Sequence, residues 1–131
     1  MNKPISIAVD AMGGENSPGK VIKGIEIHSL ETSDIFYNIF GNENSIEPLL
    51  KKTKIPTNIY KIIHTENIIK DSDSALSAAK KGKDTSMWLS IESVKKAESH
   101  AIVSAGNTGA LFVIAKPVSY THLRAHETAC Y

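Results

Sequence analysis

The amino-acid sequence predicts an α/β fold of three layers, in which helices cover both faces of a mainly parallel sheet. Short β-branched apolar runs alternate with segments of helical period, and this alternation is typical of parallel sheets with right-handed crossovers. The chain has 131 residues, of which 41% are hydrophobic, which suffices for one core and is too little for two ordinary domains. Two glycine-rich turns follow apolar runs, as expected where ligands gather at the carboxyl ends of parallel strands.

The first predicted strand and helix lie at the start of the chain. Residues 5–9 are short and rich in β-branched side chains, which indicates a buried parallel strand. Ser17 followed by Pro18 indicates an N-cap and a first helical proline, so we expect a helix over about residues 18–30. His28 shares a stripe of this helix with apolar residues, and we interpret it as a packed histidine rather than a ligand.

The rest of the chain continues the alternation. Residues 35–40 and 58–63 are predicted strands, and residues 45–52 carry apolar side chains at helical spacing. Residues 64–83 are polar and contain only short helical pieces, as many functional loops do.

A further helix is predicted over residues 85–97, a fourth strand over 101–103 and the beginning of a last helix over 111–115. The predicted order is therefore β-α-β-α-β-loop-α-β-α.

Composition narrows the function classes. The formal net charge is +1 and the lysines are scattered, so we expect no nucleic-acid partner. The apolar run ending at Asp10 is too brief for a signal-peptide core or a membrane span, which predicts a cytoplasmic location. The only cysteine, Cys130, cannot form an internal disulfide, and we assign it no role.

Residues 117–131 differ in composition from the rest. They contain the only arginine, Arg124, and the only cysteine, and they hold no lysine or isoleucine. The segment Pro117–Thr128 resembles a translation of sequencing-adapter DNA found at broken ends of assembled reading frames. We therefore interpret residues 117–131 as a non-native tail, the alternative being an unusual genuine C-terminus.

The two glycine-rich turns are the strongest candidates for a functional site. One runs from Asp10 to Gly14 and the other from Ser104 to Ala110. Small and polar residues let backbone N–H groups converge at a helix N-terminus, where they suit a phosphate or a developing oxyanion. The alternative is that Asn107 or Thr108 only caps the next helix, but two such turns at equivalent strand ends favour a ligand site.

Residues 14–21 match the phosphate-loop pattern of nucleotide hydrolases up to Lys20. The match fails at Val21, where that pattern needs a Ser or Thr hydroxyl for magnesium, and Pro18 removes a backbone donor. We do not expect a nucleotide hydrolase.

Metal sites are weakly indicated. His64, Glu66 and Asp71 have no ligand spacing, and residues 71–74 lack the further oxygen ligand and the glycine of a calcium loop. We therefore expect no metal. Residues 80–87 place lysines ahead of a helix start; they either steer an anion or form a solvated cluster beside an ordinary cap.

Three segments together resemble the bacterial phosphate acyltransferases of phospholipid synthesis, the PlsX family. They are Ile7–Gly14, Lys83–Met87 and Ser104–Ala110, and their order and approximate spacing also match. Two positions depart from the family pattern: Glu15 stands where Asp is usual, and Thr85 where Ser is usual. Both keep the chemical type.

The resemblance implies a Rossmann-like fold similar to isocitrate and isopropylmalate dehydrogenases, and a homodimer. It implies transfer of a fatty acyl group from acyl-acyl carrier protein to inorganic phosphate. A membrane glycerol-3-phosphate acyltransferase would then use the acyl phosphate, so the resemblance implies peripheral association with the inner face of the cell membrane. The reaction needs no metal or other cofactor, because phosphate itself attacks the thioester.

Site residues follow from the resemblance and the turn chemistry. The expected catalytic residues are Ser104, Asn107 and Thr108. The expected substrate- and phosphate-binding residues are Asp10, Gly13, Gly14, Lys83, Ser86, Gly106 and Gly109.

Two other functions compete with this one. The same turns could serve a non-catalytic binding module for a phosphorylated small molecule. The second competing function is that of a nicotinamide dehydrogenase of related fold. Such an enzyme is expected to carry a G-x-G-x-x-G motif after the first strand, and this sequence has none there.

Members of the resembled family are more than twice as long as this chain. We therefore interpret residues 1–116 as the N-terminal part of a phosphate acyltransferase α/β domain, and we expect the polypeptide as written to be inactive and poorly soluble.

The boundary after Lys116 gives the first testable prediction. Sequencing independent genomic DNA across this junction is expected to show a different reading frame beyond codon 116, because the composition changes there. An unbroken frame that continues as Pro117 to Tyr131 would contradict the non-native tail.

Overall fold

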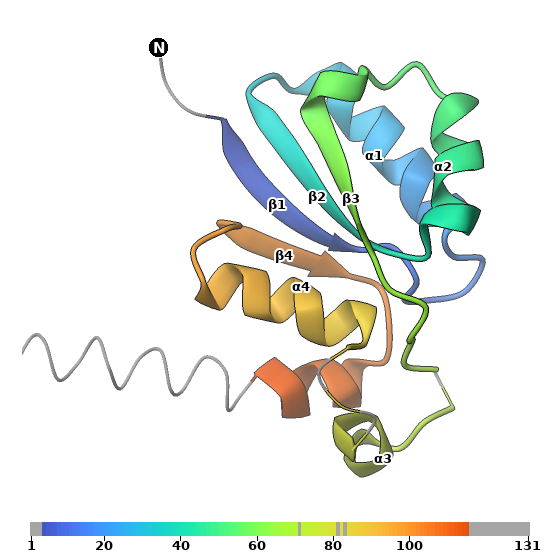
Figure 1. The fold of residues 1–131 in the computed structure, drawn as a ribbon, viewed down its shortest axis with the longest axis vertical. Coiled ribbons are helices and arrows are strands. Elements are labelled where there is room, and N and C mark those ends of the chain that lie inside the picture. The colour runs from blue at the N-terminus through green and yellow to red at the C-terminus, as the bar shows by residue number, and fades with distance from the viewer. Residues whose placement is uncertain (1–3, 71, 81, 83, 116–131) are drawn as a thin grey trace, which may run out of the picture.

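A computed structural model describes residues 4–70, 72–80, 82 and 84–115 (Figure 1). Lys83 and the predicted tail, residues 117–131, lie outside the described residues. The elements in chain order are β1 (Ile5–Asp10), α1 (Gly19–Glu31), β2 (Ile35–Gly41), α2 (Glu43–Lys51), the 3-10 helix η1 (Thr57–Ile59), β3 (Tyr60–His64), α3 (Ala75–Lys80), α4 (Ser86–Lys95) and β4 (Ala101–Ser104). Residues 108–115 are also helical.

The four strands form one sheet in the order β3-β2-β1-β4, and every pairing is parallel. In the register, Asp10 of β1 pairs with Phe40 of β2 on one side and with Ser104 of β4 on the other. The carboxyl ends of the strands therefore lie along one edge of the sheet. This confirms the α/β fold with a parallel sheet.

Helices cover both faces, as the three-layer fold requires. Figure 1 shows α1 and α2 together on one face and α4 on the other. On the α1 face, apolar side chains from α1, α2, the sheet and the turns after β1 and α2 form the larger core cluster, where each fully buried isoleucine contributes about 1.5–3 kcal/mol. That cluster is Val9, Ala11, Ile22, Ile25, Tyr37, Ile39, Ile46, Leu50 and Ile55.

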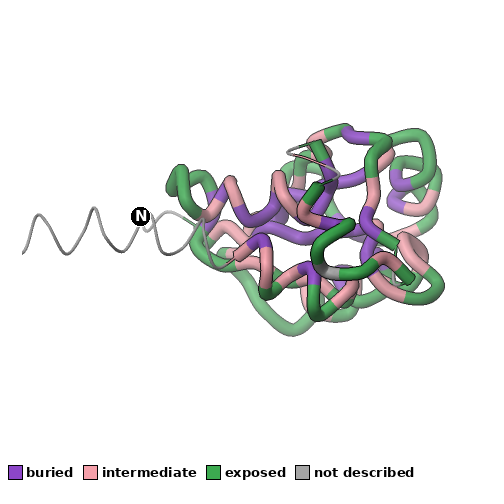
Figure 2. The backbone as a smooth tube through the Cα atoms, turned by 90° about the horizontal axis from the view of Figure 1, so that it is seen from below, coloured by how far each residue is buried: buried purple, intermediate pink, exposed green. Residues whose placement is uncertain are grey.

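The opposite face is packed by α4 and the helical residues 108–115. Its cluster consists of Ile69, Ala78, Met87, Ile91, Ala110 and Ile114. Figure 2 shows the buried stretches running through the middle of the molecule, with the exposed stretches outside them.

A buried polar group lies beneath α4. The Nδ2 of Asn38, on β2, donates to the Oγ of Ser99 at 2.9 Å, and the Oγ atoms of Ser93 and Ser99 are 3.0 Å apart. All three residues are almost fully buried. These bonds tie β2 to the turn that enters β4.

The first two helices begin one and two residues from their predicted starts, and the predicted Ser17 N-cap is wrong. Helix α1 begins at Gly19 with Pro18 as its N-cap, and Ser17 does not cap it. The Ser17 hydroxyl donates instead to the carbonyl of Gly13 inside the preceding turn. Helix α2 begins before residue 45, because the Asn42 side chain accepts from the N–H of Asn44 at 2.9 Å and caps it.

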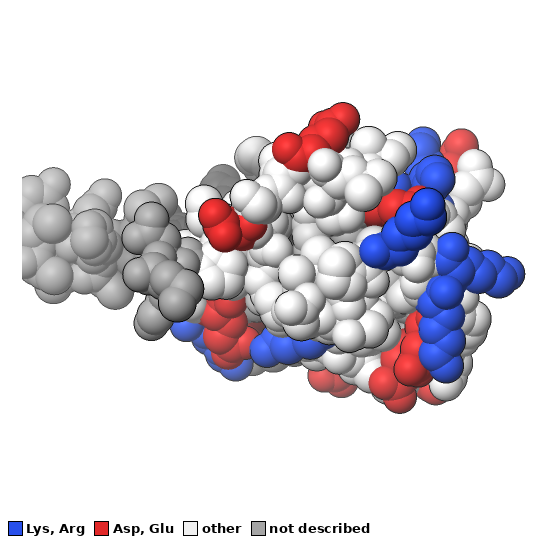
Figure 3. Space-filling model, turned by 90° about the horizontal axis from the view of Figure 1, so that it is seen from above, with Lys and Arg blue, Asp and Glu red and all other residues white. Residues whose placement is uncertain are grey.

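Two surface properties bear on partners. No helix among the described residues is long and apolar enough to cross a membrane. On the face seen in Figure 3, lysines and acidic side chains lie near one another around a largely uncharged centre.

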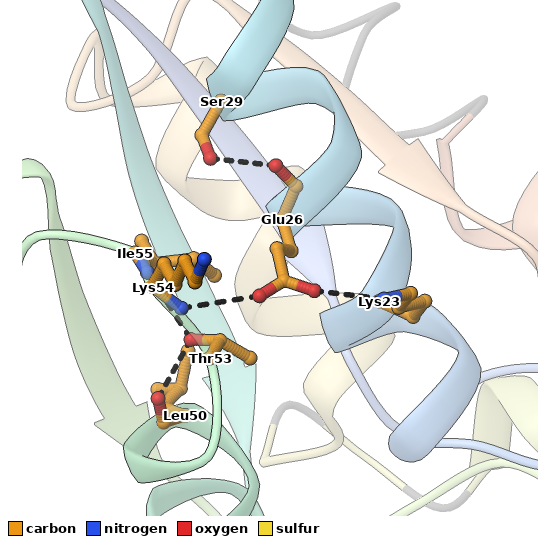
Figure 4. A network of polar contacts seen from close by, with 7 residues as sticks. All are labelled: Lys23, Glu26, Ser29, Leu50, Thr53, Lys54 and Ile55. Atoms are coloured by element: carbon orange, nitrogen blue, oxygen red, sulfur yellow. Dashed lines mark hydrogen bonds and ion pairs between the residues drawn. The ribbon is translucent and has the colours of Figure 1, made fainter.

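Glu26 links α1 to the turn after α2 (Figure 4). Its Oε1 accepts from Lys23 Nζ at 2.9 Å, and its Oε2 accepts from the backbone N–H of Lys54 at 3.1 Å. The hydrogen bond from Lys23, followed by that from Lys54, lowers the pKa of Glu26 below its usual 4.5.

This lowered pKa predicts a pH-dependent contribution to stability. Because the folded state binds the proton less tightly than the unfolded chain, the contribution is complete above about pH 4.5. It is lost as the pH falls through the lowered value. In denaturant unfolding from pH 6 to pH 3, Glu26→Gln is therefore expected to flatten the pH dependence of the free energy of unfolding.

Glu47→Gln is the matched control. Glu47 is exposed on α2, and its carboxylate has no hydrogen-bond partner among the described residues. Equal slopes for the two variants would contradict the role of Glu26.

Candidate functional site

The ends of β1 and β4 and the start of α4 meet at the buried carboxylate of Asp10. Asp10 ends β1 and is 2% exposed. Its Oδ1 accepts from the hydroxyl of Ser86, the first residue of α4, at 2.7 Å. Its Oδ2 accepts from the hydroxyl of Ser104, the last residue of β4, at 2.9 Å. The structure thus brings together three residues that sequence analysis had selected from separate motifs.

The two glycine-rich turns touch through their backbones. A Cβ added at Gly13 would lie 2.9 Å from the Cα of Gly106 and 2.7 Å from Asp10 Oδ2. Gly14 has φ +92° and leaves no room for a Cβ, which would lie 2.7 Å from the carbonyl oxygen of Ala105. Glycine at these positions is therefore required by close packing of the turns, and at Gly14 by conformation as well.

The side chain of Asn107 caps the helix that follows. Its Oδ1 accepts from the N–H of Ala110 at 3.0 Å. Its Nδ2 donates to the carbonyls of Asp73, at 2.6 Å, and Lys70, at 3.2 Å. The capping role considered from the sequence is therefore present, and the same amide also holds the loop before α3.

Thr108 and Gly109 form the exposed first turn of the helical residues 108–115. Among the described residues, neither backbone N–H has an acceptor, as is usual for the first turn of a helix. Such N–H groups carry partial positive charge and favour an anion.

A cavity of about 920 Å³ opens beside these N–H groups. Its polar end is lined by Asp10, Gly14 and the turn Gly106–Gly109, and its floor by Ile7, Val9 and Val103. Helix α1 forms one wall. Val103 is 56% exposed, since α1 does not extend over β4. The cavity therefore joins an anion-favouring end to an aliphatic floor.

Several residues that line this cavity were not selected from the sequence, among them Glu15, Lys20 and His28. Lys20, Gly24 and His28 are spaced by four residues along α1, a pattern that places them on one face of the helix. Lys20 adds a cation to the cavity wall. His28 packs edge-on against Tyr37, and its Nδ1 lies 2.6 Å from the Tyr37 hydroxyl, in agreement with the expected packed histidine. Burial raises the pKa of Tyr37.

Other expected site residues do not line the cavity. Gly13, Ser86 and Ser104 lie behind its polar end, at the contact between the turns and the Asp10 carboxylate. The hydroxyl protons of Ser86 and Ser104 are both donated to Asp10. Lys83, the expected secondary anion contact, lies outside the described residues.

Two of the three residues weighed for a metal site lie among the described residues. His64 Nε2 lies 4.0 Å from Glu66 Oε1, and Asp71 lies outside the described residues. In the part of the chain that the structure describes, no group of three or more His, Cys, Asp or Glu residues could hold a metal ion.

Comparison with known proteins identifies related sequences. The model of a family described as "Fatty acid synthesis protein" matches residues 5–121.

Proteins named phosphate acyltransferase are similar to this chain in several bacteria. That of Pelagibacter ubique is 52% identical over 116 residues, covering 88% of this chain and 34% of the relative. The phosphate acyltransferase of Parvibaculum lavamentivorans is 42% identical over 119 residues, covering 90% of this chain and 33% of the relative. The phosphate acyltransferase of Ehrlichia canis is 42% identical over 113 residues, covering 84% of this chain and 34% of the relative. The chain thus spans about a third of the length of these relatives.

The contact between the turns predicts opposite effects of alanine at two glycines. Gly13→Ala is expected to destabilise the chain by about 1–3 kcal/mol, because its Cβ meets backbone and a carboxylate. Gly24→Ala, inside α1, meets nothing within 4 Å and is expected to stabilise it by about 0.5–1 kcal/mol. Denaturant unfolding measures both. A stable Gly13→Ala variant would show that the turns do not touch.

Proposed function

Since the chain belongs to the fatty acid synthesis protein family, we propose that it forms the N-terminal part of a phosphate acyltransferase. Two relatives that carry that name match 88% and 90% of this chain. The proposed reaction transfers a fatty acyl group from the thioester of acyl-acyl carrier protein to inorganic phosphate. The product is an acyl phosphate for phospholipid synthesis.

The observation that carries this proposal is the composition of the cavity. The N–H groups of the first helical turn and Lys20 line the cavity together with the acidic Asp10 and Glu15, and the floor is aliphatic. A phosphate fits the N–H groups and Lys20, and the apolar chain of an acyl group fits the floor. The two reactants of the proposed reaction have these two properties.

The chemistry makes limited demands on the protein. A phosphate oxygen attacks the thioester carbonyl carbon, the carbonyl oxygen becomes an oxyanion, and the carbon–sulfur bond then breaks. The thiolate leaves and takes up a proton. The protein must hold phosphate in line and stabilise the oxyanion. We assign these tasks to the N–H groups of Thr108 and Gly109, with Lys20 favouring the entry of phosphate.

This assignment shifts the expected roles within the turn. The side chain of Asn107 is engaged by Ala110 and by the loop before α3, so we propose that it acts by holding the turn. Gly106, Gly109 and Gly14 bring backbone close to the anion. We retain Lys83 as a proposed secondary anion contact.

The remaining proposals rest on the family resemblance. We propose that the full-length protein is a homodimer and that a membrane glycerol-3-phosphate acyltransferase uses its product. We also propose that it associates peripherally with the inner face of the cell membrane. We propose no metal or cofactor for the reaction.

A chimera tests the proposed function. Residues 4–115 of this chain would replace the matching N-terminal third of the Pelagibacter ubique phosphate acyltransferase, which is 52% identical. Phosphorus NMR is expected to detect acyl phosphate formed from acyl-acyl carrier protein and phosphate. A folded chimera that binds phosphate but forms no acyl phosphate would contradict catalysis and favour a binding module.

In this chimera, Thr108→Pro and Thr108→Ala together distinguish the contribution of the Thr108 backbone N–H from that of its side chain. Proline suits the first helical position and removes the N–H together with the threonine hydroxyl, so kcat/KM is expected to fall about 10- to 100-fold, the effect of one charge-assisted hydrogen bond. Thr108→Ala keeps the N–H and is expected to lose much less. Phe112→Ala, at an exposed position of the same helix, is the control. Equal losses in all three variants would exclude the Thr108 amide.

A further inference from the structure

We propose that Asp10 is a positioning residue that holds the 105–109 turn in its anion-binding geometry through the hydroxyl of Ser104. This inference rests on the proposed function, because it concerns the turn assigned to phosphate there. It replaces the direct substrate contact that sequence analysis expected for Asp10.

The surroundings of Asp10 suit a structural carboxylate better than a ligand. It is 2% exposed and accepts from the Ser86 and Ser104 hydroxyls and, at 3.3 Å, from the N–H of Met12. No cation pairs with it among the described residues. A carboxylate with both oxygens engaged, and with the same charge sign as phosphate, gains nothing from contacting phosphate.

The numbers of protons and lone pairs on each group determine which group donates in each of these hydrogen bonds. An ionised carboxylate can only accept, whereas a serine hydroxyl has one proton and two lone pairs. The Ser104 proton therefore points to Asp10 Oδ2, and its oxygen is left to accept. The N–H of Gly106 donates to that oxygen at 3.2 Å. The resulting sequence is Gly106 N–H to Ser104 O–H to the Asp10 carboxylate, and each bond strengthens the next.

The same carboxylate also holds two other segments behind the polar end of the cavity. Its second oxygen holds Ser86, the first residue of α4, and Gly13 packs against both Asp10 and Gly106. If Asp10 offers fewer acceptor oxygens, the hydrogen bonds of Ser104 and Gly106 change, and the backbone that faces the cavity shifts with them.

Asp10→Asn tests the direction of the bonds. An amide offers one acceptor where the carboxylate offers two, so the hydroxyl of Ser86 or Ser104 must reverse. A reversed Ser104 accepts from the new amide with one lone pair and from the N–H of Gly106 with the other, so its proton loses the Asp10 acceptor and the charge-assisted bond that anchors the turn is lost. In the chimera, Asp10→Asn and Ser104→Ala are each expected to raise the KM for phosphate about tenfold, with little change in the KM for acyl-acyl carrier protein.

Three further variants distinguish a positioning role of Asp10 and Ser104 from a simple loss of protein stability. Ser104→Thr keeps the hydroxyl and is expected to restore the KM for phosphate. Asp10→Asn combined with Ser104→Ala is expected to cost no more than Asp10→Asn alone, because the Ser104 hydroxyl acts through Asp10. Ser99→Ala removes a buried hydroxyl bonded to Asn38, away from the turn. It is expected to lower the melting temperature with no change in the KM for phosphate.

The outcomes distinguish this inference from the proposed function. If Ser104→Ala lowers stability as Ser99→Ala does, and leaves the KM for phosphate unchanged, the positioning role is wrong while catalysis stands. If the unsubstituted chimera forms no acyl phosphate, thermal stabilisation by inorganic phosphate becomes the readout. Loss of that stabilisation in Ser104→Ala supports positioning without catalysis. Absence of stabilisation in the unsubstituted chimera overturns both.

Discussion

Two backbone turns can touch in this fold only because neither carries a side chain at the point of contact. The turn after β1 presents Gly13 and the turn after β4 presents Gly106, and a Cβ on Gly13 would come within 2.9 Å of the Gly106 Cα. Parallel pairing of β1 with β4 puts both turns at the same edge of the sheet. The contact then determines where the helix at residues 108–115 begins, and with it where the N–H groups of its first turn lie.

Burial of the Asp10 carboxylate behind this contact has an energetic cost that its hydrogen bonds must offset. Removing a charge from water is unfavourable unless its lone pairs are satisfied. Two hydroxyls and one backbone N–H satisfy them here. The site is therefore stiff on the side of the sheet and open on the side of α1, where the cavity lies. A rigid wall facing an open cavity suits the recognition of an anion, because the donors need little reorganisation when it binds.

The sequence was sufficient for the parallel sheet and for the two turns, because local patterns specify both. Alternating strand and helix periods are encoded within short windows, and glycines mark the turns directly. The hydrogen-bond partners of the site are not local. Asp10 bonds Ser104 across 94 positions and Asn107 bonds Asp73 across 34, and no window of sequence contains such pairs. The residues selected from the sequence at the strand ends lie close together in the structure, but the sequence does not tell which of them line the cavity and which hold the turns.

The helix starts were misplaced for a related reason. Ser17 has the composition of an N-cap, but its hydroxyl donates to the Gly13 carbonyl, a bond created by the tight turn that the glycines allow. The cavity wall on α1 was missed because Lys20 was considered only in the phosphate-loop match and His28 only in an apolar stripe, so the two residues were never considered together. A spacing of four residues was the available signal.

The engagement of Asn107 has a consequence for how the site can move. Its amide donates to the carbonyls of Lys70 and Asp73 while its oxygen caps the helix at Ala110. The loop before α3 and the anion-favouring N–H groups are thus held by one side chain. Any displacement of that loop must either break these bonds or rotate Asn107 away from its cap, and each change alters the first turn of the helix. The polar loop is therefore coupled mechanically to the anion end of the cavity, although it does not line it.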